Sequence, residues 1–110
     1  MTVDPILTNE QQGHDALFDG LDFDPVKRTV SIRLQTYPAH DAAERIDVVL
    51  VFEKVANLAV NADLASLASN RFAGTVSYWH IAERKGTSHI YLAGGYIAVT
   101  HGTAPKLIRV

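Results

Sequence analysis

Residues 29 to 37 alternate between polar and apolar side chains, and this alternation narrows the range of possible folds. The apolar positions are Val30, Ile32 and Leu34, and polar residues stand between them. A repeat of two residues is typical of a β-strand with one buried face. Pro38 lacks the N–H that would continue a strand ladder. The segment therefore predicts a half-buried strand that ends before Pro38.

Most of the remaining sequence predicts further short strands. They are expected over residues 16–23, 45–55, 55–60, 76–82, 89–92, 96–100 and 106–110. In the first of them, Leu17, Leu21 and Phe23 are spaced by even numbers of residues and are expected on one face of the strand, whereas Phe18 is expected on the other. A bulge is expected near Gly20. In the second, apolar residues on both faces predict a central strand that is covered on both sides.

One short helix is expected over residues 64–68. Asn61 and Asp63 are suitable N-terminal caps, and Asn70 is a suitable stop. Gly94 and Gly95 predict a tight turn or a bulge before the next strand, because glycine relieves the steric limit on backbone φ. No rhythm of alternating strands and helices is present, which disfavours parallel doubly wound folds.

These elements predict a mainly β fold, an antiparallel β-sandwich or open barrel of six to eight short strands with one short helix. A helix packed on a single antiparallel sheet stays open as an alternative. The chain of 110 residues suits one core. Residues 1–13 are expected to be a lead-in segment that is only partly ordered, and residues 14–110 a single β-rich domain.

Composition removes several classes of function. The chain has no cysteine, which excludes disulfides, thiolate metal sites and a cysteine nucleophile. Its net charge of −2 gives no reason to expect nucleic-acid binding. No apolar run of about 18 residues occurs, so no membrane association is expected, and the amino terminus does not resemble a signal peptide. We therefore expect a cytoplasmic protein.

No catalytic motif is recognisable. The sequence has no G-x-S-x-G elbow, no phosphate-binding P-loop and no G-x-G-x-x-G turn. None of the five histidines stands at a compact metal-ligand spacing. We therefore expect a protein that is not an enzyme and that uses no metal and no other cofactor.

The most informative local pattern is a hairpin predicted around residues 84–87. Pairing Trp79 with the strand that contains Ile90 on the core face forces the alternate residues outward. Aromatic rings with polar edges suit an interface. The sequence therefore predicts one binding surface. Its residues are Tyr78, His80, His89 and Tyr91.

Two functional interpretations of this surface stay open. The first is a non-catalytic protein-interaction domain that binds a protein partner or a second copy of itself. The second is a small-ligand binding protein or hydrolase with a pocket near Tyr78, His80 and Tyr91.

The segments GHDALFDGLDFDPVKRTVSIRLQTYP and RIDVVLVFEKV lie between Gly13 and Val55. In this half of the chain the sequence resembles small uncharacterised bacterial β-domains of the toxin-immunity type. The residues that carry the resemblance are His14, Asp15, Ala16, Phe52 and Val55. The resemblance implies a bacterial, non-catalytic protein that binds and blocks another protein in the same cell.

Overall fold

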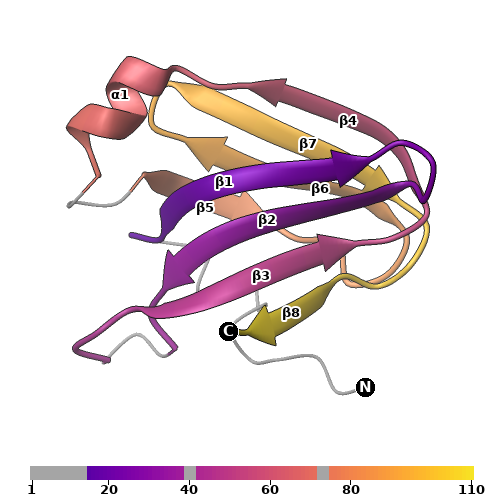
Figure 1. Ribbon diagram of the computed structural model, residues 1–110, viewed down its shortest axis with the longest axis horizontal. Helices are drawn as coiled ribbons and strands as arrows, with labels where there is room; N and C mark the ends of the chain where they lie inside the picture. The colour runs from indigo at the N-terminus through magenta and orange to yellow at the C-terminus, as the bar shows by residue number, and fades with distance from the viewer. Residues whose placement is uncertain (1–14, 39–41, 72–74) are drawn as a thin grey trace.

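The computed structural model describes residues 15–38, 42–71 and 75–110, which form eight strands and one helix (Figure 1). The predicted lead-in segment, His14 and His40 lie outside these ranges. The elements, in chain order, are β1 (Leu17–Asp24), β2 (Thr29–Thr36), β3 (Ile46–Phe52), β4 (Val55–Asn61), α1 (Leu64–Ser69), β5 (Val76–His80), β6 (Gly86–Leu92), β7 (Gly95–His101) and β8 (Lys106–Arg109).

The described strands form two antiparallel sheets of four strands each. Sheet A has the order β1-β2-β3-β8, and sheet B has the order β4-β7-β6-β5. The two sheets lie one in front of the other in Figure 1, with α1 at one end. The predicted mainly β fold with one short helix is confirmed, in its sandwich-like form with open sheets.

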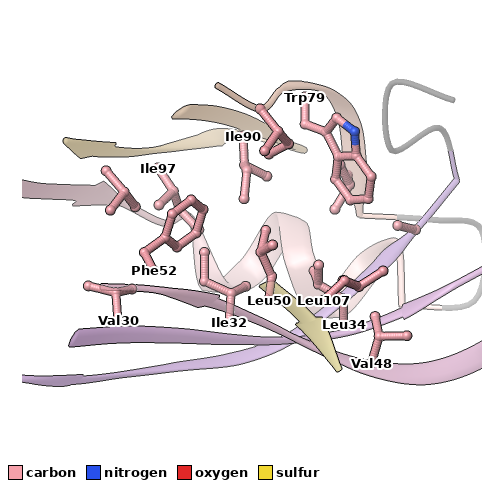
Figure 2. Packing of buried hydrophobic residues seen from close by; sticks show 14 of the residues in the cluster. Val30, Ile32, Leu34, Val48, Leu50, Phe52, Trp79, Ile90, Ile97 and Leu107 are labelled. Atoms are coloured by element: carbon pink, nitrogen blue, oxygen red, sulfur yellow. The ribbon is translucent and has the colours of Figure 1, made fainter. Parts of the chain in front are cut away.

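The core fills the space between the sheets. In Figure 2, Trp79 and Ile90 of sheet B point toward Ile32, Leu34 and Leu50 of sheet A. All five side chains are at most 1% exposed. The alternation in β2 produces this arrangement, because every second side chain of a strand points to the same face. The opposite face of each sheet is left for solvent or for a partner.

The bulge predicted in the first strand is present between Phe18 and Gly20. The predicted facing of the residues before it is wrong. Phe18 pairs with Leu34 and lies against the core together with Leu21, whereas Leu17 pairs with Gln35 on the other face. One inserted residue moves every preceding side chain of the strand to the opposite face of the sheet.

The prediction that the strand over residues 45–55, which is β3, is covered on both sides is also wrong. β3 is central in sheet A, between β2 and β8, and its core-facing residues Val48, Leu50 and Phe52 are buried. Val49 and Val51, on the other face, are only half-buried. Its apolar run reflects a central position within one sheet and not burial by a third layer.

The helix begins at the predicted residue, Leu64, and ends at Ser69, one residue beyond the predicted range. Asp63 is its N-cap and accepts a hydrogen bond from the Ser66 N–H at 3.1 Å, and Asn70 is the C-cap. Hydrogen bonds from the Ser66 backbone and side chain hold the pKa of the Asp63 carboxyl below its usual value. The carboxylate is therefore the form that stabilises the helix start.

This capping predicts a pH dependence of the helix. A lowered pKa in the folded state contributes stability above the unfolded value near pH 4, and this contribution is lost as the pH falls through the folded value. We expect the hydrogen-exchange protection factors of the Ser66 and Leu67 amides, which compare each rate with that of an unfolded chain at the same pH, to fall below about pH 4. In Asp63→Asn, which caps without titrating, this acid dependence should vanish. An unchanged acid dependence in that variant would show that another group is responsible.

Candidate protein-binding face

The hairpin of β5 and β6 brings together the residues predicted from the sequence. Tyr78 pairs with Tyr91 and His80 pairs with His89, while Trp79 and Ile90 form the core-facing pair between them. Tyr78 and Tyr91 are 38% and 40% exposed, whereas Trp79 is fully buried. The predicted shared face of these four residues is therefore confirmed, and it lies on the outer side of sheet B.

A fifth aromatic residue joins this group from β7. Leu92 and Gly95 flank a two-residue turn in which Gly94 has a φ of 71°, a conformation that glycine adopts without strain. The turn sets a register that places Tyr96 opposite Tyr91. We call Tyr78, His80, His89, Tyr91 and Tyr96 the aromatic face.

Sequence reasoning missed Tyr96, although its signal was present. The sequence predicts a turn at Gly94, but the hairpin prediction does not extend the alternation of faces from Tyr91 across this turn to Tyr96. With the turn between Leu92 and Gly95 fixed, the period of two aligns Tyr96 with Tyr91 on the adjacent strand.

The rings of the aromatic face form a connected cluster. The ring centroids are 5.4 Å apart for Tyr78 and Tyr91, 5.3 Å for Tyr91 and Tyr96, and 5.9 Å for His89 and Tyr96. The Nδ1 atom of His89 lies 3.0 Å from the Tyr96 hydroxyl, within hydrogen-bond distance. Ring contacts of this kind order side chains before any partner arrives, which lowers the entropy cost of binding.

The outer face of sheet B carries no charged side chain among the described strand residues. The register places on it the following side chains besides the aromatic face: Asn57, Ala59 and Asn61 of β4, Ala98 and Thr100 of β7, and Thr87 of β6. Ala98 is only 9% exposed, yet it is not a member of the core cluster. The described strand residues of this surface thus include five aromatic side chains and no Asp, Glu, Lys or Arg.

The outer face of sheet A has a different character. Asp22 and Arg33 form an ion pair there, and the Gln35 amide donates to Asp19 at 3.0 Å. Charged residues are depleted and tyrosine is enriched at the centres of protein interfaces. Of the two outer faces, that of sheet B has the composition of an interface.

A buried serine and histidine pair lies on the inner face of sheet B. The Ser88 hydroxyl lies 2.7 Å from Nε2 of His101, whose Nδ1 lies 2.8 Å from the Thr103 carbonyl oxygen. Because the carbonyl can only accept, Nδ1 carries the proton and Nε2 accepts from Ser88. Ser88 and His101 are 1% and 3% exposed. The pair resembles a nucleophile and base in geometry, and its hydrogen bonds tie β6 and β7 to the segment after β7.

Three pockets lined by described residues lie away from the aromatic face. One lies beside α1 at Phe18 and Leu67, one beside Phe23 and Val55, and one at Lys54. None of the three is lined by Tyr78, His80 or Tyr91.

His80 and His89 are directly paired across β5 and β6. Within residues 15–38, 42–71 and 75–110, no group of three or more histidine, aspartate or glutamate residues is placed to hold a metal ion. The same ranges contain no helix that is long and apolar enough to cross a membrane.

No protein-family model, no curated protein and no solved structure matches the chain.

Proposed function

We propose that this protein is a non-catalytic interaction domain that binds a protein partner through the aromatic face. The observation that supports the proposal is the ordered cluster of Tyr78, Tyr91 and Tyr96 on a sheet face without charged side chains. Tyrosines offer a large contact area with few rotatable bonds, and they are frequent among the residues that dominate binding energy.

The kind of partner follows from the chemistry of the surface. A face without Asp, Glu, Lys or Arg gives little electrostatic steering, so the partner should present apolar or aromatic side chains and few charges of its own. The Tyr78 and Tyr91 hydroxyls make no hydrogen bond within the described part of the chain. They are therefore available to polar groups of the partner.

The resemblance to immunity-type proteins gives a sharper version of this proposal. It implies that the partner is a toxin whose activity is blocked by binding. A toxin gene beside the gene for this chain would support it. Co-expression should then protect cells from the captured partner. A partner that is harmless to cells would contradict the inhibitor version while leaving the interaction domain in place.

The proposal predicts a large loss of affinity in Tyr78→Ala/Tyr91→Ala. The partner is first isolated on the immobilised wild-type protein from cells that make it, then purified and titrated by calorimetry. Truncating one central tyrosine typically costs about 2 kcal/mol, or about 30-fold in affinity. The double variant should lose at least that factor.

Two matched variants complete this experiment. Tyr78→Phe/Tyr91→Phe keeps both rings and should retain most of the affinity. Ser31→Ala/Gln35→Ala alters the outer face of sheet A and should bind like the wild type. Equal affinity of the wild type and the Tyr78→Ala/Tyr91→Ala variant would refute the proposal, provided that circular dichroism shows both to be folded.

A further inference from the structure

The two sheets have four edge strands, and three of them carry features that prevent pairing with another chain. β1 contains three aspartates and a bulge, and β8 has only four residues, with Lys106 and Arg109 at its ends. β5 has five residues and a bulge, and the backbone N–H of Val76 at its start donates to the Ala16 carbonyl at 2.8 Å. Charges, short length and bulges are the usual protection of exposed sheet edges.

β4 lacks this protection. It has seven residues, contains no charged residue and no proline, and has a bulge only at its start, between Val55 and Asn57. In Figure 1 it is the outermost strand of sheet B, beside β7. Val60 is 46% exposed although it lies on the core-facing side of the strand. Among the described residues, β4 is thus a regular edge beyond Asn57, paired on one side only, with β7.

The register identifies the backbone groups that this edge offers. Leu92 and Gly95 flank the β6–β7 turn, so they form a hydrogen-bonded pair, and every second residue of β7 from Gly95 onward faces β6. Tyr96, Ala98 and Thr100 therefore face β4, opposite residues 61, 59 and 57. The N–H and C=O groups of the alternate residues, Leu58 and Val60, must point to the open edge.

The sequence of this edge is self-complementary when two copies of the strand pair antiparallel. Residues 57–61 read Asn-Leu-Ala-Val-Asn. In an antiparallel pair of two copies centred on Ala59, Asn57 lies opposite Asn61 of the other copy, Leu58 lies opposite Val60, and Ala59 lies opposite itself. Amide faces amide and apolar faces apolar at every position. An isologous two-fold interface requires this self-complementarity.

We propose that β4 is a dimerisation edge that pairs with β4 of a second copy of this chain. Leu58 and Val60 of each copy would exchange backbone hydrogen bonds with Val60 and Leu58 of the other. Since neither strand is charged, no like charges meet across the two-fold axis. The exposed side chain of Val60 would be covered by Leu58 of the second copy.

The pairing has a consequence for the aromatic face. The two-fold axis of an antiparallel strand pair is perpendicular to the sheet, so both outer faces lie on the same side of one continuous eight-stranded sheet. The dimer would therefore present two aromatic faces in the same direction, which raises the avidity for a bivalent partner. This consequence rests on the proposed function, whereas the dimer does not.

A charge swap at Ala59 tests the proposal. Residues opposite each other at the centre of this pairing are a non-hydrogen-bonded pair, with Cα atoms about 4.5 Å apart. Ala59→Lys therefore brings two cations together, and Ala59→Glu brings two carboxylates together. By light scattering over protein concentrations from about 1 µM to about 1 mM, a range suited to a small interface, the wild type should dimerise with rising concentration.

Each charge variant should stay monomeric over this range, and an equimolar mixture of the two should dimerise again. Ala59→Ser, an uncharged substitution at the same position, should dimerise like the wild type. Val60→Pro removes one outward N–H without removing a bond to β7, and it should be monomeric. Circular dichroism checks that each variant is folded.

Three results would overturn the dimerisation edge. They are a wild type that is monomeric at every concentration, an Ala59→Lys variant that dimerises as well as the wild type, and a mixture of charge variants that fails to associate. Tyr78→Ala/Tyr91→Ala should keep the dimer. If that variant is monomeric while Ala59→Lys dimerises, the aromatic face and not β4 is the self-association surface.

Discussion

Trp79→Ala should lower the free energy of unfolding by about 3 to 5 kcal/mol, the usual cost of truncating a buried aromatic residue. Trp79 is the largest of the fully buried side chains in the described chain, and it packs between the sheets opposite residues of β2 and β3. Removing it leaves a cavity that a two-sheet core cannot easily close. Urea unfolding followed by circular dichroism measures the loss.

Two comparisons isolate the role of burial at this position. The Nε1 atom of Trp79 is buried and makes no hydrogen bond within the described residues, so Trp79→Phe sacrifices no polar contact and should cost clearly less than Trp79→Ala. Tyr78→Ala, one residue away on the exposed face, should cost little stability. A similar loss in Tyr78→Ala and Trp79→Ala would contradict the assignment of inner and outer faces.

His101→Ala should lower the free energy of unfolding by about 2 to 4 kcal/mol, from a lost buried ring and from polar groups left without partners. The substitution leaves the Thr103 carbonyl and the Ser88 hydroxyl without the imidazole, and it removes a ring 4.9 Å from that of Phe52. Thermal and urea unfolding measure the effect.

Thr100→Ala is the matched control for His101→Ala. Thr100 is adjacent but half-buried on the outer face, where its hydroxyl contacts that of Thr87 at 3.0 Å. It should cost less than about 1 kcal/mol, since this contact is only partly buried. An equal loss in the two variants would mean that the hydrogen bonds of His101 contribute no more than those of a surface residue.

The hairpin face could be predicted because it depends only on local rules. Trp79 and Ile90 are large and apolar, so burial of this pair decides the facing of the whole hairpin, and Tyr78 and Tyr91 follow from a period of two. The helix could also be predicted from the local sequence, because Asp63 and Asn70 are common cap residues.

Other features depend on information that no short pattern contains. The bulge beside Gly20 reversed Phe18 and Leu17, and where a bulge inserts its extra residue depends on contacts with the neighbouring strand. The pairing of Ser88 with His101 joins two strands across an inner face, and the edge position of β4 depends on the order of strands in the sheet. Such long-range arrangements follow from the whole fold.

The two proposed surfaces belong to one sheet but use different groups. The aromatic face uses side chains of β5, β6 and β7, whereas the dimerisation edge uses the backbone of β4. Because β7 separates β4 from β6, substitutions at Ala59 leave the contact between Tyr78 and Tyr91 unchanged. Binding of a partner and self-association can therefore be measured independently.

Position-specific cross-linking tests the central claim most directly. A photoreactive phenylalanine analogue is placed at Tyr78 or Tyr91 on the outer face of sheet B, and at Arg33 or Gln35 on that of sheet A, in cells that make the protein. We predict that irradiation joins the same partner protein to the chain at positions 78 and 91 and not at positions 33 and 35. Cross-links to a partner from 33 and 35 alone would contradict a binding site on the aromatic face.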